Sequence, residues 1–195
     1  MFDVISELDR SCLLWINQGL KNPVFDMLMP IISSWKFFLL PLVLIVAVVL
    51  IRGGVKQRLA LVALLAAFSI GDSLTTYVVK PFFGRPRPYA TVSGLHVYKT
   101  GWTVSQRIPA HQTLSFPSAH AVNTAAAATV LIYYFRRWWS PVVLVLFLVC
   151  FSRVYLGLHY PGDVLAGVVF GGCCGGLVLG IMNLWPRIIP GCPDR

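Results

Sequence analysis

Long apolar stretches separated by short polar segments dominate the chain. Several of them approach or reach the about 20 residues that a helix needs to cross a bilayer. Pro30 and Pro41 predict a kink or break in the first stretch, because a proline inside a helix removes a hydrogen bond. The last stretch is rich in glycine, which permits close packing of helices. The pattern predicts spans over residues 23–51, 59–79, 118–135, 141–158 and 164–185.

Two segments outside these spans have a different pattern. Residues 1–22 place Phe2, Ile5, Leu8, Cys12 and Trp15 on one side of a helix, which predicts an interfacial helix. A helix packed against the bundle fits this pattern equally well, and a helix that crosses the membrane would add a sixth span. The segment at about 80–117 is too polar to cross and too long for a turn, so we expect a partly structured cap.

The fold class follows from these patterns. We predict an all-α, polytopic transmembrane helix bundle of five to six spans, with an interfacial N-terminal helix and a cap loop over the site. Residues 1–195 form a single domain in this prediction.

Composition supports an integral membrane protein. Hydrophobic residues make up 57% of the chain and charged residues only 12%, whereas a soluble domain carries about 25% charged residues. The net charge of +9 would suit nucleic acid, but the basic residues lie in loops between spans and in polar clusters. We therefore predict the lipid bilayer as the surroundings and no nucleic-acid partner.

The distribution of basic residues predicts the orientation. One tight loop contains Arg52, Lys56 and Arg58, another contains Arg136 and Arg137, and neither contains a carboxylate. Short loops rich in lysine and arginine stay in the cytoplasm. We expect a multi-pass membrane protein with these loops in the cytoplasm and the opposite face outside the cell, which is the periplasm in a Gram-negative source.

Three polar clusters lie at the ends of apolar stretches, and the alternation of spans brings them to one membrane face. They supply cations, two histidines, a serine and a carboxylate, an inventory that suits binding a phosphate and attacking it. The clusters are Lys80–Pro88 (K-P-F-F-G-R-P-R-P), Phe116–His120 (F-P-S-A-H) and Ser152–Asp163 (S-R-V-Y-L-G-L-H-Y-P-G-D).

At these clusters the chain resembles the type 2 phosphatidic acid phosphatase (PAP2) family, in particular its small bacterial lipid phosphatases. Lys80 with Arg87-Pro88 matches the first family motif, and Ser152-Arg153 with His159 and Asp163 matches the third. The second motif reads Pro117-Ser118-Ala119-His120, with alanine where the family usually has glycine. The backbone N–H that this position offers to phosphate is kept by alanine.

The resemblance implies a role for each histidine. His159 would be the nucleophile that forms a phosphohistidine, and Asp163 would hold the tautomer that frees its attacking nitrogen. His120 would protonate the leaving oxygen and later activate water. The Tyr160-Pro161-Gly162 link argues against one continuous helix, so we expect a contact between a turn and a helix.

The remaining matched residues would bind phosphate. Arginine fits phosphate with two parallel hydrogen bonds, and lysine acts as a point charge. The start of the third span would add backbone N–H groups at a helix terminus. The phosphate-binding set is Lys80, Arg87, Ser118, Ala119 and Arg153.

Other polar residues receive other interpretations. We expect His96 and His111 to be solvated cap residues. Arg85 is interpreted as a surface or headgroup residue, with a phosphate contact as the alternative. Asp72 lies inside the second span, where a carboxylate is expensive, and is expected to pair with a basic group or a neighbouring helix.

Two other classes of function compete. A metal-dependent hydrolase could use His120, His159 and Asp163 as ligands, but the surrounding cations would repel a divalent ion. A non-catalytic anion transporter or lipid-binding protein could use the same cations, although it leaves the spacing of His159 and Asp163 unexplained. We predict an enzyme with no cofactor, no metal and no obligate protein partner.

The sequence leaves the lipid phosphate substrate open. The size of the chain and the outward site favour undecaprenyl diphosphate. Phosphatidylglycerol phosphate, phosphatidate and the lipid A 1-phosphate are the alternatives.

Overall fold

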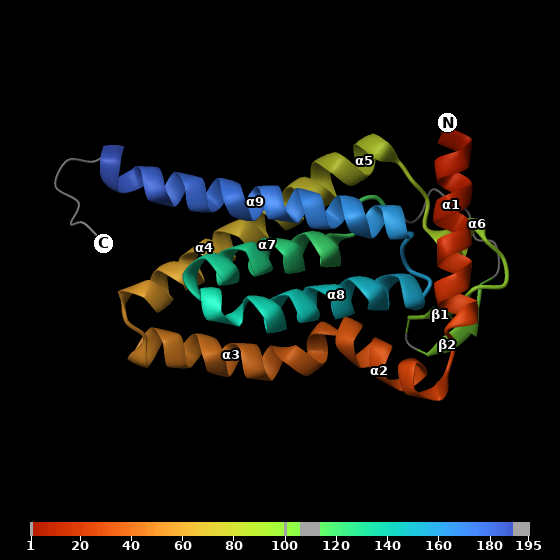
Figure 1. Ribbon diagram of the computed structural model, residues 1–195, viewed down its shortest axis with the longest axis horizontal. Helices are drawn as coiled ribbons and strands as arrows, with labels where there is room; N and C mark the ends of the chain where they lie inside the picture. Colours follow the sequence, from red (N-terminus) through yellow and green to blue (C-terminus); the bar gives the residue numbers. More distant parts are fainter. Residues whose placement is uncertain (1, 100, 106–113, 189–195) are drawn as a thin grey trace.

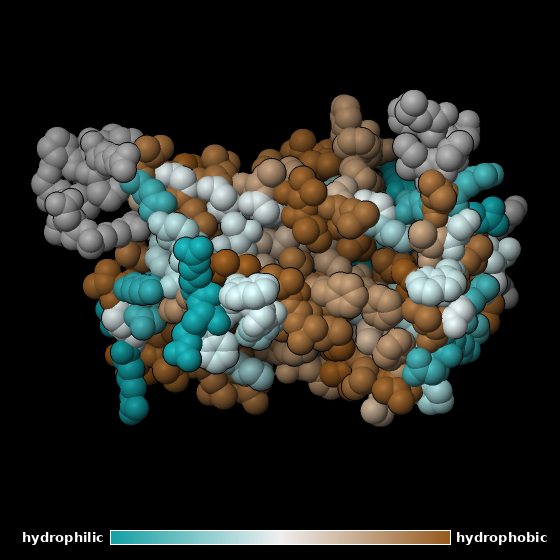
Figure 2. All heavy atoms as spheres, viewed as in Figure 1, coloured by the Kyte–Doolittle hydropathy of each residue, from teal (hydrophilic) through white to brown (hydrophobic). Residues whose placement is uncertain are grey.

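The computed structural model describes residues 2–99, 101–105 and 114–188. Five helices lie side by side along the long axis of the molecule (Figure 1). Apolar side chains form a broad band around the middle of the visible face, and polar residues gather at both ends (Figure 2). The five are α3 (Trp35–Arg52), α4 (Val55–Leu74), α7 (Ala119–Tyr134), α8 (Trp139–Tyr155) and α9 (Pro161–Ile188).

Among the residues that the structure describes, four helical segments are long and apolar enough to cross a membrane, by length and composition. They are Trp35–Arg52, Val55–Phe83, Arg136–Tyr155 and Pro161–Leu184. The remaining predicted span, over residues 118–135, corresponds to α7, which has only 16 residues. It nevertheless runs beside the other four and packs against α4, α8 and α9. The helical membrane bundle is confirmed, and a count of five spans stays a prediction that depends on α7.

The segment Val55–Phe83 is longer than α4 alone. A π-helical turn η2 (Thr75–Val79) and the short helix α5 (Lys80–Phe83) continue α4 without a break. At the opposite end of the bundle a 3₁₀ turn η4 (Arg136–Trp138) joins α7 to α8. Lys80 therefore lies in the last turn of the continuous helical segment Val55–Phe83, where the first polar cluster begins.

A seam of small residues joins α9 to α7. Gly167, Gly171 and Gly175 recur every four residues and all face α7. A Cβ atom added at Gly171 would lie 2.1 Å from the carbonyl oxygen of Val122. Only glycine allows the two backbones to approach this closely. The predicted use of the glycines in close helix packing is therefore confirmed.

The first predicted span is broken, but not at a proline. Helix α2 (Pro23–Ser33) ends before Ser34, whose backbone is extended, and α3 begins at Trp35, so Pro30 and Pro41 both lie inside helices. Pro30 cannot bond to the carbonyl of Asp26, and the indole N–H of Trp102 donates to that oxygen instead, at 3.3 Å. This contact gives the freed carbonyl a partner, and α3 likewise continues through Pro41.

Helix α1 (Phe2–Leu14) crosses the end of the bundle instead of running along it, so it is not a sixth span (Figure 1). A π-helical turn η1 (Trp15–Gly19) follows it. Leu13 and Asn17 are buried against the bundle, whereas Leu8 and Trp15 are 61% and 64% exposed. The helix therefore packs on the protein through one side and leaves its predicted apolar side open. The side chains of Phe2 and Ile5 lie outside the described part.

The predicted cap is partly structured where it is described. It contains α6 (Pro88–Thr91) and an antiparallel pair of strands, β1 (His96–Tyr98) and β2 (Trp102–Val104). Asn17 fastens β1 to the bundle, because its side-chain amide donates to the carbonyl oxygens of His96 and Tyr155, both at 2.7 Å. The imidazole of His96 lies 3.2 Å from the Lys21 ammonium. His111 lies outside the described residues.

Candidate active site

The three polar clusters meet at one end of the bundle, the end that also carries α1 and the cap (Figure 1). Lys80 opens α5, and His120 lies in the first turn of α7. Arg153 lies in the last turn of α8, His159 in the following turn, and Asp163 in the first turn of α9. The fold therefore brings the three polar clusters together at one end of the bundle, as the sequence predicts. The basic loops at Arg52–Arg58 and Arg136–Arg137 lie at the other end.

His159 and Asp163 face each other across the turn between α8 and α9. The two side chains are buried, with 2% and 0% of their surfaces exposed, and His159 Nδ1 lies 3.6 Å from Asp163 Oδ2. The backbone N–H of Tyr160 donates to the same oxygen at 2.9 Å. The contact joins a turn to a helix, as the Tyr160-Pro161-Gly162 sequence predicts. This arrangement directs the carboxylate toward Nδ1 and leaves the other ring nitrogen free to react.

The surroundings of His159 keep its imidazole neutral. Burial, together with the nearby charges of Arg87, Arg153 and Lys80, holds the pKa of His159 well below its usual value. The unfolded chain would bind a proton here below about pH 6.5, whereas the folded protein would not. The folded state therefore loses stability as the pH falls below that value, and above it the neutral ring keeps a nucleophilic lone pair.

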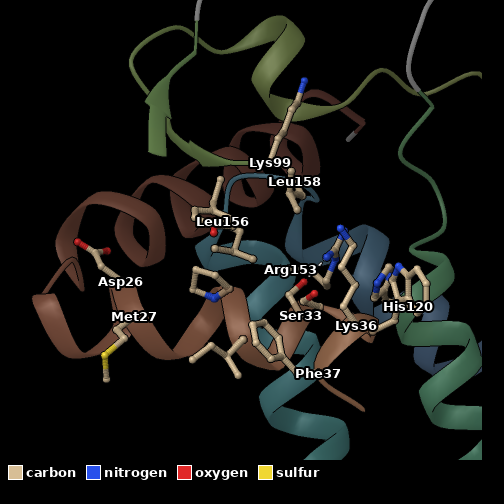
Figure 3. A pocket seen from close by; sticks show the side chains of 15 residues that line it. Asp26, Met27, Ser33, Lys36, Phe37, Lys99, His120, Arg153, Leu156 and Leu158 are labelled. Atoms are coloured by element: carbon tan, nitrogen blue, oxygen red, sulfur yellow. Dashed lines mark hydrogen bonds between the residues drawn. The ribbon is translucent and has the colours of Figure 1, made fainter. Parts of the chain in front are cut away.

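Two adjoining cavities share the lining residue Leu158, which directly precedes His159, whereas His159 and Asp163 themselves are not among the residues that line them. The larger, about 770 Å³, is lined by His120 and Arg153, and Figure 3 shows both side chains at its inner end. The other, about 600 Å³, is lined by Lys80 and Arg87. The two cavities share Leu158 and Lys99 in their linings. The predicted cations and His120 thus line adjoining hollows of a size that accommodates a headgroup.

Arg153 and Arg87 are held by few protein groups. The Arg153 guanidinium is buried, one of its terminal nitrogens donates to the hydroxyl of Ser33, and its Nε has no partner among the described residues. Arg87 Nε donates to the carbonyl oxygen of Leu114 at 3.3 Å. A buried cation with an unused donor, such as Arg153, has the chemistry of an anion site, because an anion would supply the missing acceptor, and the half-buried Arg87 lies close enough to act on the same charge.

Ser118 and Ala119 lie where the second motif enters α7. Ser118 is fully buried and occupies the position before the helix, yet its hydroxyl neither caps the helix nor bonds to any described group. Its backbone N–H donates to the carbonyl oxygen of Asp163 at 3.0 Å. The hydroxyl therefore stays available to a ligand. Ser152, by contrast, donates to the carbonyl of Val149 at 2.7 Å.

Arg85 has a role that sequence reasoning missed. Its guanidinium bonds to Asp163 Oδ1 at 2.8 Å and to Asp9 Oδ2 at 2.5 Å, and it lies 4.2 Å from the centre of the Tyr160 ring. Burial alone would lower the pKa of Arg85, but the two carboxylates outweigh it and raise the pKa. The interpretation as a surface or headgroup residue did not include these two ion pairs, and a phosphate contact of Arg85 stays a prediction. Asp9 had no sequence signal beyond its charge.

Ser33 and Lys36 were also missed. Both line the larger cavity, and Lys36 extends toward Arg153 and His120 (Figure 3). A signal for Lys36 was present, because it is the only charged residue in the apolar stretch 27–51 and isolated charges in spans are often functional. Lys99 of the cap lines both cavities. Asp72 instead bonds to a neighbouring helix, accepting from the amide of Asn123 at 3.0 Å.

Comparison with known proteins agrees with this geometry. The model of the PAP2 superfamily matches residues 57–187. A lipid A 4'-phosphatase of Bacteroides thetaiotaomicron is 31% identical over 91% of this chain and 78% of its own length. The undecaprenyl-diphosphatase BcrC of Bacillus subtilis is 27% identical over 76% of this chain and 70% of its own.

A solved structure shows the same fold. The crystal structure of a transmembrane PAP2-type phosphatidylglycerolphosphate phosphatase from Bacillus subtilis superposes with a TM-score of 0.66. The match covers 97% of this chain and 90% of the other, at 24% identity. At that identity the match concerns the fold alone.

Proposed function

We propose that this protein releases phosphate from a lipid headgroup without a metal ion. The chain belongs to the PAP2 superfamily and is an integral membrane hydrolase of phosphoric esters. The observation that carries the proposal is the buried His159, 3.6 Å from Asp163, beside the cations Lys80, Arg87 and Arg153. These cations supply the charge stabilisation that phosphoryl transfer requires.

The proposed reaction has two steps. The His159 nitrogen remote from Asp163 attacks phosphorus, a P–N bond forms, and the bond from phosphorus to the lipid oxygen breaks as His120 donates a proton to that oxygen. His120, now neutral, takes a proton from water, which attacks phosphorus and breaks the P–N bond. Phosphate leaves and both histidines return to their first state. Ser118 and the N–H of Ala119 would hold the phosphoryl oxygens.

A polyprenyl diphosphate such as undecaprenyl diphosphate is the substrate that the cavity favours. Lys36 and Lys99 line the two cavities and could add two cations to the three proposed for the transferred phosphoryl group, once the Lys99 ammonium leaves its place 3.9 Å from the centre of the Tyr89 ring. A diphosphate would use them, since its second phosphate must lie within a few ångströms of the first. The apolar residues Ile31, Trp35 and Phe37 line the same cavity and suit the start of a lipid tail.

A lipid A phosphate is the second candidate. The specific observation in its favour is the similarity to a lipid A 4'-phosphatase over 91% of the chain. A phosphomonoester on a sugar would leave Lys36 and Lys99 to bind other polar groups of the headgroup.

Phosphate release by the purified protein in detergent tests the function. Undecaprenyl diphosphate, lipid A, phosphatidylglycerol phosphate and phosphatidate are compared as substrates, each with and without EDTA. We expect hydrolysis that EDTA leaves unchanged, competitive inhibition by vanadate, which adopts the five-coordinate geometry of the transferred group, and the highest kcat/KM for the diphosphate. Loss of activity in EDTA with recovery on adding a divalent metal would refute the metal-free mechanism.

We also propose that the site faces the periplasm or the outside of a bacterial inner membrane. The basic loops lie at the end of the bundle opposite the site, which supports this orientation. The exposed residues Ser93 and Gln57 mark the two ends. With the native cysteines removed, Ser93→Cys should react with an impermeant thiol reagent in intact cells, and Gln57→Cys only after lysis. The reverse pattern would place the site in the cytoplasm.

A further inference from the structure

We propose that Asp9 and Arg85 form a positioning device for the catalytic carboxylate, through which α1 holds Asp163 in the orientation that His159 needs. The inference rests on the proposed function, because it assigns Asp163 its role toward the nucleophile. It adds two residues, one of them on the N-terminal helix, that lie outside the three sequence motifs.

Four polar contacts connect α1 to the catalytic pair. Asp9 Oδ1 accepts from the backbone N–H of Gly162 at 2.7 Å, and Asp9 Oδ2 accepts from Arg85 at 2.5 Å. Arg85 donates to Asp163 Oδ1 at 2.8 Å. Asp163 Oδ2 lies 3.6 Å from His159 Nδ1. Because Gly162 directly precedes Asp163, Asp9 holds both the backbone beside the catalytic carboxylate and the cation that binds it.

Each oxygen of Asp163 therefore has its own task. Arg85 occupies Oδ1, while Oδ2 receives the N–H of Tyr160 and faces His159. A carboxylate held at both oxygens cannot rotate about its Cβ–Cγ bond, so Oδ2 stays directed at the imidazole. Without Arg85, Oδ1 would lose this ion pair and the carboxylate could turn away from the ring, with the Ser115 hydroxyl as a remaining neutral partner of Asp163.

Arg85 acts on the far side of Asp163 from the phosphate-binding cations. It lines a separate cavity of about 540 Å³ together with Asp9 and Gly162, whereas Lys80, Arg87 and Arg153 line the two cavities described above. Its guanidinium already bonds to two carboxylates and lies against the ring of Tyr160. This arrangement fits a residue that acts through Asp163 and does not contact substrate.

The side of α1 that faces the site supports the same conclusion. Asp9, Leu13 and Asn17 follow one another at four-residue intervals, and all three contact the bundle end or the cap. The side chain of Asp9 is only 9% exposed although it carries a charge. A buried carboxylate is costly unless it is paired, so the pairing with Arg85 specifies how α1 docks.

The test compares Arg85→Gln, Arg85→Lys and Asp9→Asn with the matched control Glu7→Gln, which removes a charge from an exposed position of the same helix. Each full-length protein is assayed with p-nitrophenyl phosphate and with a lipid phosphate. We expect Arg85→Gln to lower kcat about 10- to 100-fold, since a misplaced reacting group costs about that much. Asp9→Asn should lower kcat about 3- to 10-fold, and KM should stay within about 2-fold in both.

Three further measurements separate positioning from other roles. Arg85→Lys should recover part of the lost kcat, because a lysine keeps the charge. Adding Arg85→Gln to Asp163→Asn should cost little more than Asp163→Asn alone, since the two act as a unit. Thermal midpoints should remain close to wild type. A rise in KM without a change in kcat would overturn the proposal. So would a double variant whose loss in kcat equals the product of the two single losses, or losses in activity that parallel losses in the thermal midpoint.

A readout without substrate keeps this test independent of the proposed function. In ¹⁵N-histidine NMR spectra of the detergent-solubilised protein, His159 should show one tautomer protonated at Nδ1, and Arg85→Gln should give a mixture. Absence of phosphate release by the wild type with this change in tautomer would refute the function and support the positioning device. Unchanged tautomers in all variants would overturn the device.

Discussion

Helices α9 and α3 are equally apolar but have opposite relations to the protein. Their mean hydropathies are 2.2 and 2.3, so hydrophobicity does not distinguish them. Helix α9 lies against α7 through Gly167, Gly171 and Gly175, whereas no residue of α3 is buried. What differs is the size of the side chains, because small residues allow contact between helix backbones and large ones leave a surface suited to lipid.

The difference separates two tasks at the site. The close seam between α7 and α9 joins Ser118 and His120 to Asp163, and the N–H of Ser118 bonds directly to the Asp163 carbonyl. The peripheral helix α3 supplies Lys36 and apolar residues to the wall of the larger cavity. The packing of α7 against α9 thus holds Ser118, His120 and Asp163, whereas Lys36, proposed for recognising the headgroup, lies on a helix open to the bilayer.

The largest effect is expected at the proposed nucleophile, which lies beside the tightly packed seam of α7 and α9. His159→Ala should lower kcat by about four orders of magnitude or more, because removing a nucleophile costs that much in comparable enzymes, and the thermal midpoint should change little. His96→Ala, a histidine of the cap, should keep wild-type kcat. Retention of more than a few per cent of the rate by His159→Ala would refute the nucleophile assignment.

The glycine seam itself is the next test. Gly171→Ala should destabilise the protein by about 3 kcal/mol, because its Cβ would lie 2.1 Å from the Val122 carbonyl oxygen and overpacked sites cost about that much. Gly176→Ala is the matched control on the same helix, since nothing lies within 4 Å of its added Cβ. Thermal unfolding in detergent measures both. Equal thermal midpoints for Gly171→Ala and Gly176→Ala would show that the packing of α9 against α7 does not depend on small residues.

The sequence predicts best the helices that pack around the seam of α7 and α9. Apolar length located the helices to within a few residues, and the motif spacings identified side chains that meet at one end of the bundle. Contacts within a motif, such as His159 with Asp163, are set by local turn geometry, which the Tyr160-Pro161-Gly162 sequence indicates. The roles of these residues in catalysis stay predictions until the variants are measured.

The peripheral elements were predicted less well, for physical reasons. The break between α2 and α3 lies at Ser34 and not at Pro30, where Trp102 of the cap donates to the carbonyl that the proline leaves free. The pairing of Asp9 with Arg85 joins residues 76 positions apart. Neither partner can be read from hydropathy or spacing, since both contacts depend on how α1 and the cap dock on the bundle.

A smaller effect is expected on the peripheral side of the site. Lys36→Met should lower kcat/KM for a diphosphate lipid about 10-fold, the value of one charged hydrogen bond, and for a monophosphate lipid no more than about 2-fold. Lys56→Met, at the opposite end of the bundle, is the control and should leave both values unchanged. Equal losses on the two lipids would remove the reason to prefer a diphosphate.

The smallest effect is expected on the lipid-facing surface of α3. Leu44 is 57% exposed on this helix, whereas Leu179 of α9 is 7% exposed within the packed cluster of α4, α7 and α9. Leu179→Ala should cost about 2 to 3 kcal/mol because it opens a cavity among packed neighbours. Leu44→Ala should cost no more than about 0.5 kcal/mol, since lipid tails fill the space that the side chain leaves. Thermal unfolding in detergent and in lipid nanodiscs measures the pair. If Leu44→Ala were as damaging as Leu179→Ala, α3 would have to pack against protein in the membrane, and the contrast between a rigid seam and a lipid-facing helix would fail.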